Sequence, residues 1–182
     1  MKNLTYTLKV WPVITIVVIG LCYLTQWGAK AFFGIELPEQ DALQPVLNTL
    51  RSAFTDLAHF KAAAANLGLI LGFAPIVEEI YFRAILWKLP AKGLSALAKK
   101  FNWTRTAAAI PVVLAVLASA IFSAAHYLQM HWPNNAFIAL FVFGLAQCWL
   151  YAKTKWLWCP MLNHFLFNLT NLILLFFVPT GT

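Results

Sequence analysis

Long apolar runs separated by short polar stretches dominate the pattern of this 182-residue chain. Five of these runs are long enough for a helix to cross the hydrocarbon layer of a membrane, the fourth only just. They cover residues 10–33, 62–87, 106–128, 136–152 and 156–178. Because every backbone polar group in lipid has to be bonded internally, the pattern predicts an all-α fold, a polytopic bundle of about five transmembrane helices.

Composition supports a membrane protein and excludes a soluble domain. Hydrophobic residues make up 62% of the chain and charged residues only 10%, and the mean hydropathy is +0.74, far from the values of soluble globular proteins. We find no repeat, no low-complexity tract and no nucleic-acid-binding module, so nucleic acid is not an expected partner. The sequence predicts one membrane-embedded domain over residues 1–182, with its core at about 62–178.

The net charge of +7 is explained by topology. Nine basic residues fall on one side of the predicted spans: Lys2, Lys9, Lys88, Lys92, Lys99, Lys100, Arg105, Lys153 and Lys155. Only Lys30, Arg51 and Lys61 fall on the other side. This asymmetry predicts a cytoplasmic N-terminus and an outer C-terminus. Five short crossings without a retrieval signal favour a prokaryotic plasma membrane. Cleavage of the first apolar run as a signal peptide after residues 29–31 is an alternative that leaves the remaining orientation unchanged.

The longest polar connection, residues 34–61, carries its own apolar pattern. Apolar residues recur there at steps of three and four: Leu43, Val46, Leu47, Leu50, Phe54, Leu57 and Ala58. This spacing is typical of an amphipathic helix, and we expect one on the outer membrane surface. Packing against the rim of the bundle and a role in substrate entry are both open.

Two adjacent carboxylates, Glu78 and Glu79, lie within the second apolar run. An ionised side chain at membrane depth costs a few kcal/mol unless it has a partner, so such residues are functional candidates. Glu79 and Arg83 are four residues apart, which predicts an ion pair on one helix face. Glu78 points about 100° away around the helix and is free for chemistry. The alternative is a Glu–Arg pair that only braces the bundle, with Glu78 protonated.

Polar residues in two other runs complete a candidate hydrolytic site. His126 follows Phe122 by four residues in the third run, and Asn168 follows His164 by four residues in the fifth, so each pair shares a helix face. A carboxylate and a histidine can activate water, while a second histidine and an asparagine can hold an oxyanion. Counting from the basic loop, Glu78 lies about 15 Å deep and His126 about 30 Å. A third helix beginning near Pro111, together with helix tilt, would close most of this difference in depth.

The cysteines are weaker candidates for a functional role. Cys22, Cys148 and Cys159 all lie in apolar runs, and their odd number and spacing predict no disulfide framework. Cys159 is five residues from His164, a spacing that turns the two side chains apart on a helix. We therefore expect the cysteines to be small core residues.

The three motifs resemble those of a known family. Residues 78–83 have the form EExxxR, residues 122–126 the form FxxxH and residues 164–168 the form HxxxN. In this order on successive membrane helices they resemble the CPBP family, the CAAX proteases and bacteriocin-processing enzymes also called Abi, and its Rce1-like glutamic-type members. The resemblance covers residues 74–168, and Ala84 stands where the family often has glycine.

The resemblance implies an intramembrane endopeptidase that cleaves a membrane-anchored or lipidated protein or peptide. It implies that Glu78 with His126 activates water, that Glu79 supports them, and that His164 with Asn168 stabilises the oxyanion. No cofactor is favoured. A zinc enzyme, with Glu78, His126 and His164 as ligands, is the open alternative. A non-catalytic immunity or interaction protein on the same scaffold, and a transporter, are the other two hypotheses.

Overall fold

The structure is a computed structural model that describes residues 2–37, 44–53, 55, 57–128 and 135–177. The helices are α1 (Lys2–Phe33), α2 (Gln44–Ser52), α3 (Leu57–Leu67), η2 (Gly68–Phe73), α4 (Ala74–Glu79), η3 (Ile80–Lys88), α5 (Leu89–Lys100), α6 (Thr104–Leu128), α7 (Phe137–Thr154) and α8 (Trp158–Phe177). The described residues contain no strand, so the all-α prediction is confirmed. Five helical stretches are long and apolar enough to cross a membrane, which makes the protein a multi-pass membrane protein.

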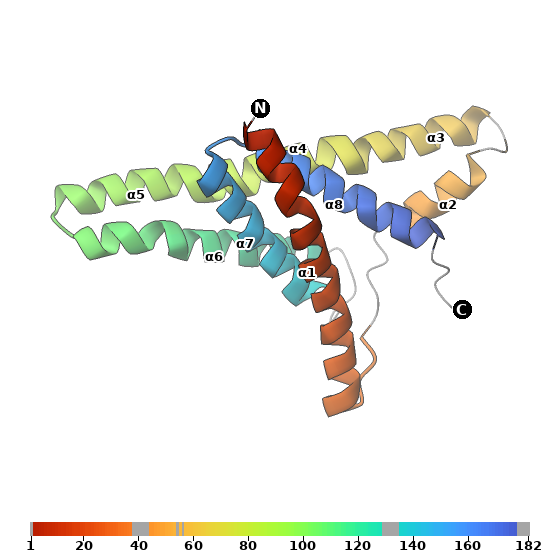
Figure 1. Cartoon of the computed structure of the whole chain (residues 1–182), viewed down its shortest axis with the longest axis horizontal. Helices are drawn as coiled ribbons and strands as arrows, with labels where there is room; N and C mark the ends of the chain where they lie inside the picture. The colour runs from red at the N-terminus through yellow and green to blue at the C-terminus, as the bar shows by residue number, and fades with distance from the viewer. Residues whose placement is uncertain (1, 38–43, 54, 56, 129–134, 178–182) are drawn as a thin grey trace.

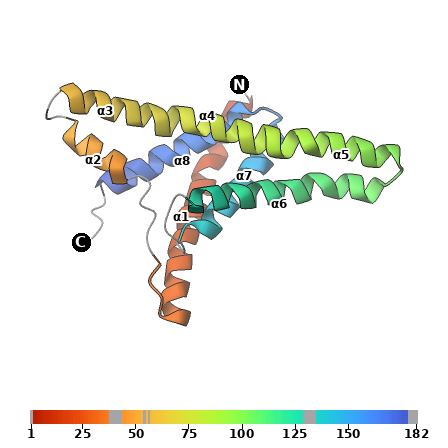
Figure 2. The ribbon, with the colours of Figure 1, turned by 180° about the vertical axis from the view of Figure 1, so that it is seen from behind.

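The second of these stretches is one continuous helix of 44 residues, Leu57–Lys100. It runs through α3, η2, α4, η3 and α5 and is about 66 Å long, twice the thickness of a hydrocarbon core. Figure 1 shows it as the longest rod of the molecule, with α6 folded back along its α5 end and α8 lying beside its α3 end. In the reverse view α1 and α7 cross behind this rod (Figure 2).

Two π-helical segments, η2 and η3, flank the short α4 that carries both glutamates. The backbone N–H of Ala74 donates to the carbonyl of Leu69, five residues earlier, and that of Leu89 donates to Ala84 in the same way. Pro75 has no N–H to donate, so it favours this widened turn. Such π segments are frequent at functional sites, and here they set the rotation of α4 within the long helix.

Aromatic side chains from four elements form the core beneath this region. Phe82, Phe122, Phe143 and Phe167, from η3, α6, α7 and α8, belong to one buried cluster. The contact between α6 and α7 is tight, because a Cβ atom added at Gly144 would lie 2.9 Å from the Cβ of Ser119. Glycine at this position therefore allows α7 to approach the helix that carries His126.

The structure corrects two sequence-based expectations. The amphipathic helix expected in the connection 34–61 is present as α2 but is shorter than predicted, since α2 ends at Ser52 and a separate helix, α3, begins at Leu57. Val46 and Leu47 of α2 are buried with Leu172 of α8, so α2 packs on the rim of the bundle. Leu43 and Phe54 lie outside the described residues, as does Val178 at the end of the last predicted span.

The third helix does not begin near Pro111. Instead α6 starts at Thr104 and includes Pro111, and the Trp87 indole N–H donates to the Pro111 carbonyl at 2.8 Å. The α5–α6 hairpin thus extends the two helices together beyond the bundle (Figure 1). Glu78 and His126 come level because the second helix continues to Lys100 before the hairpin turn, so the two residues lie equally far from that turn on the two helices.

Candidate functional site

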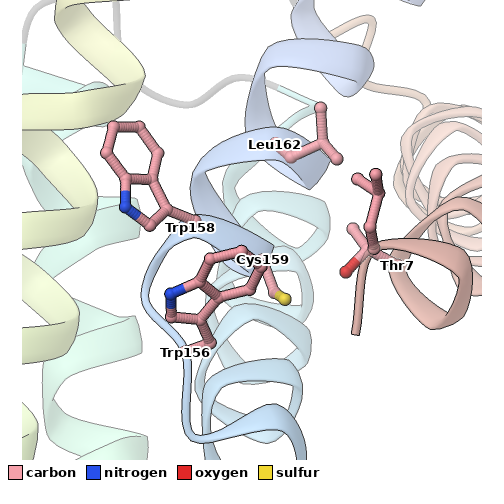
Figure 3. Close-up of a pocket in the computed structure, with 6 residues that line it drawn as sticks. Thr7, Trp156, Trp158, Cys159 and Leu162 are labelled. Atoms are coloured by element: carbon pink, nitrogen blue, oxygen red, sulfur yellow. The ribbon is translucent and has the colours of Figure 1, made fainter. Parts of the chain in front are cut away.

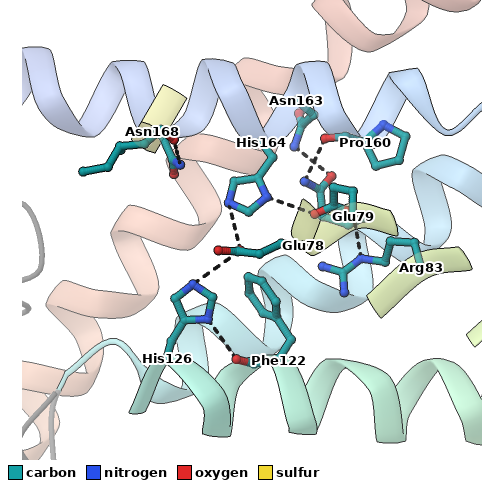
Figure 4. A network of polar contacts seen from close by, with 11 residues as sticks. Glu78, Glu79, Arg83, Phe122, His126, Pro160, Asn163, His164 and Asn168 are labelled. Atoms are coloured by element: carbon teal, nitrogen blue, oxygen red, sulfur yellow. Dashed lines mark hydrogen bonds and ion pairs between the residues drawn. The ribbon is translucent and has the colours of Figure 1, made fainter. Parts of the chain in front are cut away.

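Three membrane helices meet at a cluster of polar side chains in the centre of the bundle. Figure 4 shows Glu78 and Glu79 from α4, His126 from α6 and His164 from α8 directed toward one another. Residues that are far apart in the sequence, such as 78, 126 and 164, are thereby brought within side-chain contact. Residues from all three sequence motifs thus meet in one site. Asn168, the last residue of the HxxxN motif, does not take part in these contacts.

Glu79 is the buried centre of this cluster. Its Oε2 lies 3.0 Å from Arg83 Nε, the i, i+4 ion pair expected from the sequence, and both side chains are fully buried. Its Oε1 lies 3.0 Å from His164 Nδ1. A carboxylate oxygen only accepts hydrogen bonds, so His164 Nδ1 is the donor. Glu79 therefore fixes the ring of His164 and leaves its Nε2 facing Glu78.

Arg83 is held by aromatic rings as well as by Glu79. Its guanidinium carbon lies 4.8 Å from the ring centre of Phe122 and 5.8 Å from that of Phe82. Cation–π contacts of this kind are strongest where water is excluded, and Arg83 is fully buried. Its Nη1 and Nη2 have no hydrogen-bond partner among the described residues. The ring of Phe122, in the FxxxH motif, therefore contacts Arg83 as well as His126.

Glu78 lies between the two histidines. Its Oε2 is 3.6 Å from His126 Nε2 and 3.8 Å from His164 Nε2, both longer than a hydrogen bond. The His126 Nδ1 lies 2.9 Å from the Phe122 carbonyl; because that oxygen only accepts, Nδ1 carries the proton and Nε2 faces Glu78. The Glu78 side chain is partly exposed, at 26%, but the Oε2 atom that faces the histidines is buried and has no hydrogen-bond partner among the described residues.

Asn168 lies one turn further along α8, and its amide is engaged elsewhere. Its Nδ2 donates to the Ile70 carbonyl at 3.1 Å, within the π-helical η2. No ion pair or hydrogen bond among the described residues joins it to Glu78 or His164. The second N–H of the amide is not used in this bond, and Figure 4 shows Asn168 on the same side of α8 as His164.

A second polar network was not predicted from the sequence. Gln147 of α7 is fully buried, and its Nε2 donates to the Pro160 carbonyl at 3.1 Å. Its Oε1 accepts from Asn163 Nδ2 at 3.1 Å, so α7 is tied to the first turns of α8, next to His164. The sequence signal for this network was Gln147 itself, a glutamine within an apolar run, because a buried side-chain amide needs a hydrogen-bond partner.

Two alternative chemistries concern a metal ion and a cysteine nucleophile. The described residues contain no group of three or more His, Cys, Asp or Glu side chains that could hold a metal ion. Cys159 is not directed toward the site; its thiol lies 3.7 Å from the Asn3 carbonyl. All three cysteines are free, and Cys148 and Cys159 are buried.

Comparison with known proteins gives the family. A family model described as type II CAAX prenyl endopeptidase Rce1-like matches residues 60–170, more than half of the chain. No match was found among curated proteins or among solved structures. The matched region contains all three motifs and every residue of the polar cluster. The chain therefore belongs to the Rce1-like family of type II CAAX prenyl endopeptidases, within the CPBP proteins.

Proposed function

We propose that this protein is a glutamic-type intramembrane endopeptidase that hydrolyses a peptide bond in a lipidated or membrane-anchored protein. The family is one of CAAX-type peptidases, which supports hydrolysis as the reaction class. The observation that carries the proposal is the position of Glu78, whose Oε2 faces the Nε2 atoms of two histidines at 3.6 and 3.8 Å. These distances leave a place where a water molecule can bridge the groups.

In this proposal Glu78 and His126 activate that water. Glu78 accepts a proton while the water oxygen attacks the scissile carbonyl carbon. The neutral His126 carries its proton on Nδ1, so its Nε2 lone pair can accept a hydrogen bond from the same water. When the tetrahedral intermediate collapses, the C–N bond breaks and the proton passes from Glu78 to the leaving amine. Glu78 and His126 are therefore the proposed catalytic residues.

His164 and Asn168 are the proposed donors to the oxyanion. Because His164 Nδ1 already donates to Glu79, its Nε2 can donate to an oxyanion only when the ring is protonated. The Glu79 carboxylate, 3.0 Å away, stabilises that cation, as an acidic partner does for a catalytic histidine. Asn168 contributes its second N–H without releasing Ile70. Glu79 and Arg83 are positioning residues in this scheme.

The glutamic mechanism is favoured over a zinc mechanism by the chemistry of the residues. Asparagine is an uncommon zinc ligand and a common oxyanion donor. If zinc were bound, Glu78, His126 and His164 would hold it, and it would make a water molecule easier to deprotonate. In that case Glu79 and Arg83 would still orient the ring of His164 and exclude lipid from the site.

The proposed substrate is a protein with a prenyl group or a membrane helix near the cleaved bond. Glu78 sits on a membrane-spanning helix, so a substrate has to present its peptide bond within the bilayer. Prenylated C-terminal peptides are the first class to test, because the family description names them.

A cellular cleavage screen tests the proposal. Reporters with prenylated C-termini or single membrane anchors are expressed with the wild type, with Glu78→Gln and with Glu36→Gln as a matched control outside the site. We expect cleavage with the wild type and Glu36→Gln and none with Glu78→Gln. Full biological activity of the Glu78→Gln variant would contradict catalysis and favour an interaction protein on the same scaffold.

A further inference from the structure

A cavity of about 410 Å³ opens between the first turns of α1 and the beginning of α8, away from the glutamates (Figure 3). Six residues line it: Leu4, Thr7, Trp156, Trp158, Cys159 and Leu162. The polar atoms of its two most buried lining residues are directed to the backbone. The Thr7 hydroxyl donates to the Asn3 carbonyl at 2.9 Å, and the Cys159 thiol lies 3.7 Å from the same oxygen. The cavity therefore presents an apolar wall.

Its size and lining fit one hydrocarbon chain. The volume lies in the range of about 300–1,000 Å³ that is usual for small-molecule sites. Trp156 and Trp158 are about half exposed, and tryptophan is enriched where the hydrocarbon core meets the head groups. A chain that enters the cavity from the bilayer would thus keep its polar end at the level of the two indoles.

Three lysines are sequence neighbours of the residues at this end of the cavity, although none of them lines it. Asn3 Nδ2 donates to the Thr154 carbonyl at 3.2 Å, which joins the start of α1 to the turn between α7 and α8. Lys2, Lys153 and Lys155 flank this contact and are exposed. No ion pair among the described residues involves these three lysines.

No described acid balances this charge. The carboxylates in the part of the chain that the structure describes are Glu36, Glu78 and Glu79. Glu36 pairs with Lys30 beyond the other end of α1, and the remaining two belong to the central site. Positive charge at a membrane surface attracts anionic lipid, each lysine contributing about a fivefold factor in binding. Three lysines that are unpaired among the described residues thus favour a head group with a net negative charge over a zwitterionic one.

We propose that this cavity is a binding site for an anionic phospholipid, with one acyl chain between α1 and α8 and the phosphate against Lys2, Lys153 and Lys155. The site is distinct from the proposed catalytic centre and does not depend on the protease assignment. Because the lipid would bridge α1 and α8, it would hold α1 against the helix that carries His164.

Photo-crosslinking in nanodiscs tests the site. The purified chain is reconstituted with phosphatidylcholine and a small fraction of phosphatidylglycerol that carries a diazirine in one acyl chain, and crosslinked peptides are mapped by mass spectrometry. We expect crosslinks to concentrate on residues 4–7 and 156–162. Leu162→Trp fills the cavity and is expected to reduce them at least fivefold, while Leu174→Trp, an exposed position on the same helix, leaves them unchanged.

The contribution of the three lysines is tested by a charge-matched pair of variants. Lys153→Gln with Lys155→Asn removes two charges and keeps a residue suited to the left-handed backbone at position 155, where φ is 58°. Crosslinking of phosphatidylglycerol should fall roughly tenfold or more, but not in Lys99→Gln with Lys100→Gln. Thermal unfolding of each variant shows that it is folded.

Three results would overturn the proposal. The first is crosslinking spread evenly over the lipid-facing residues, and the second is equal labelling by a phosphatidylcholine probe. The third is displacement of the probe by a farnesylated peptide, which would assign the cavity to the lipid group of a substrate. None of these results requires proteolytic activity, so they are independent of the test of Glu78.

Discussion

The Glu79–Arg83 ion pair should dominate the stability of the central site. Both side chains are fully buried and their charged atoms lie 3.0 Å apart, so solvent does not screen the interaction. Removing one partner of such a pair leaves an uncompensated buried charge, at a cost of about 3–5 kcal/mol. Arg83→Met also loses the contact with the Phe122 ring, worth about 2 kcal/mol when desolvated. We expect Arg83→Met to lower the free energy of unfolding by about 5–7 kcal/mol.

A double-mutant cycle separates the pair from its surroundings. Glu79→Gln keeps an oxygen that can accept from His164 Nδ1 but removes the charge, and should cost about 3–5 kcal/mol. Glu79→Gln with Arg83→Met removes both charges, so the double variant should be clearly more stable than the sum of the single losses predicts.

Equilibrium unfolding of the purified protein by SDS in mixed micelles measures all four free energies. The cycle is valid only if each variant gives one reversible transition. Single variants within about 1 kcal/mol of the wild type, or a double variant that equals the sum of the two losses, would refute this account of the pair.

The remaining predictions concern packing, the α7–α8 link and metal. Gly144→Ala places a methyl group 2.9 Å from the Ser119 side chain and should lower the unfolding free energy by about 1–3 kcal/mol. As a control, Gly93→Ala meets open space and should raise the unfolding free energy by about 0.5–1 kcal/mol. Unchanged stability of Gly144→Ala would refute the close contact. Gln147→Leu leaves Asn163 without its acceptor and should cost about 1–3 kcal/mol, measured by the same unfolding assay, and equal stability would show that the link is dispensable. Chelation of divalent metal should leave cleavage of a reporter unchanged, and loss of cleavage that zinc restores would favour the metalloprotease mechanism.

Much of the fold could be predicted from hydrophobicity, because length and polarity are strongly constrained in lipid. The long helix through Lys100 could not. Residues 88–100 carry four lysines and follow the predicted second span, yet Ala91 and Ala98 are buried, and the Ser95 hydroxyl donates to the Ala107 carbonyl at 3.0 Å. The alanines, leucines and lysines of this stretch are good helix formers and the stretch packs against α6, but the hydropathy pattern ends the predicted span at Trp87.

The candidate site was predicted in its local parts. The i, i+4 spacing correctly gave the Glu79–Arg83 pair, because both residues lie on one helix. The bond from Asn168 to Ile70 and the link between Gln147 and Asn163 could not be predicted, since they depend on how α7 and α8 pack. The catalytic roles of Glu78, His126, His164 and Asn168 stay predictions.

The most direct test of the central claim is the single-turnover cleavage rate of Glu78→Gln in proteoliposomes. A prenylated peptide substrate is used, with binding measured separately by fluorescence anisotropy and folding by thermal unfolding. The account predicts that the rate falls by about 10²–10⁴, the range for loss of a general base, while substrate affinity and folding are retained. A folded Glu78→Gln protein that cleaves the peptide at the wild-type rate would contradict the claim that Glu78 activates the water.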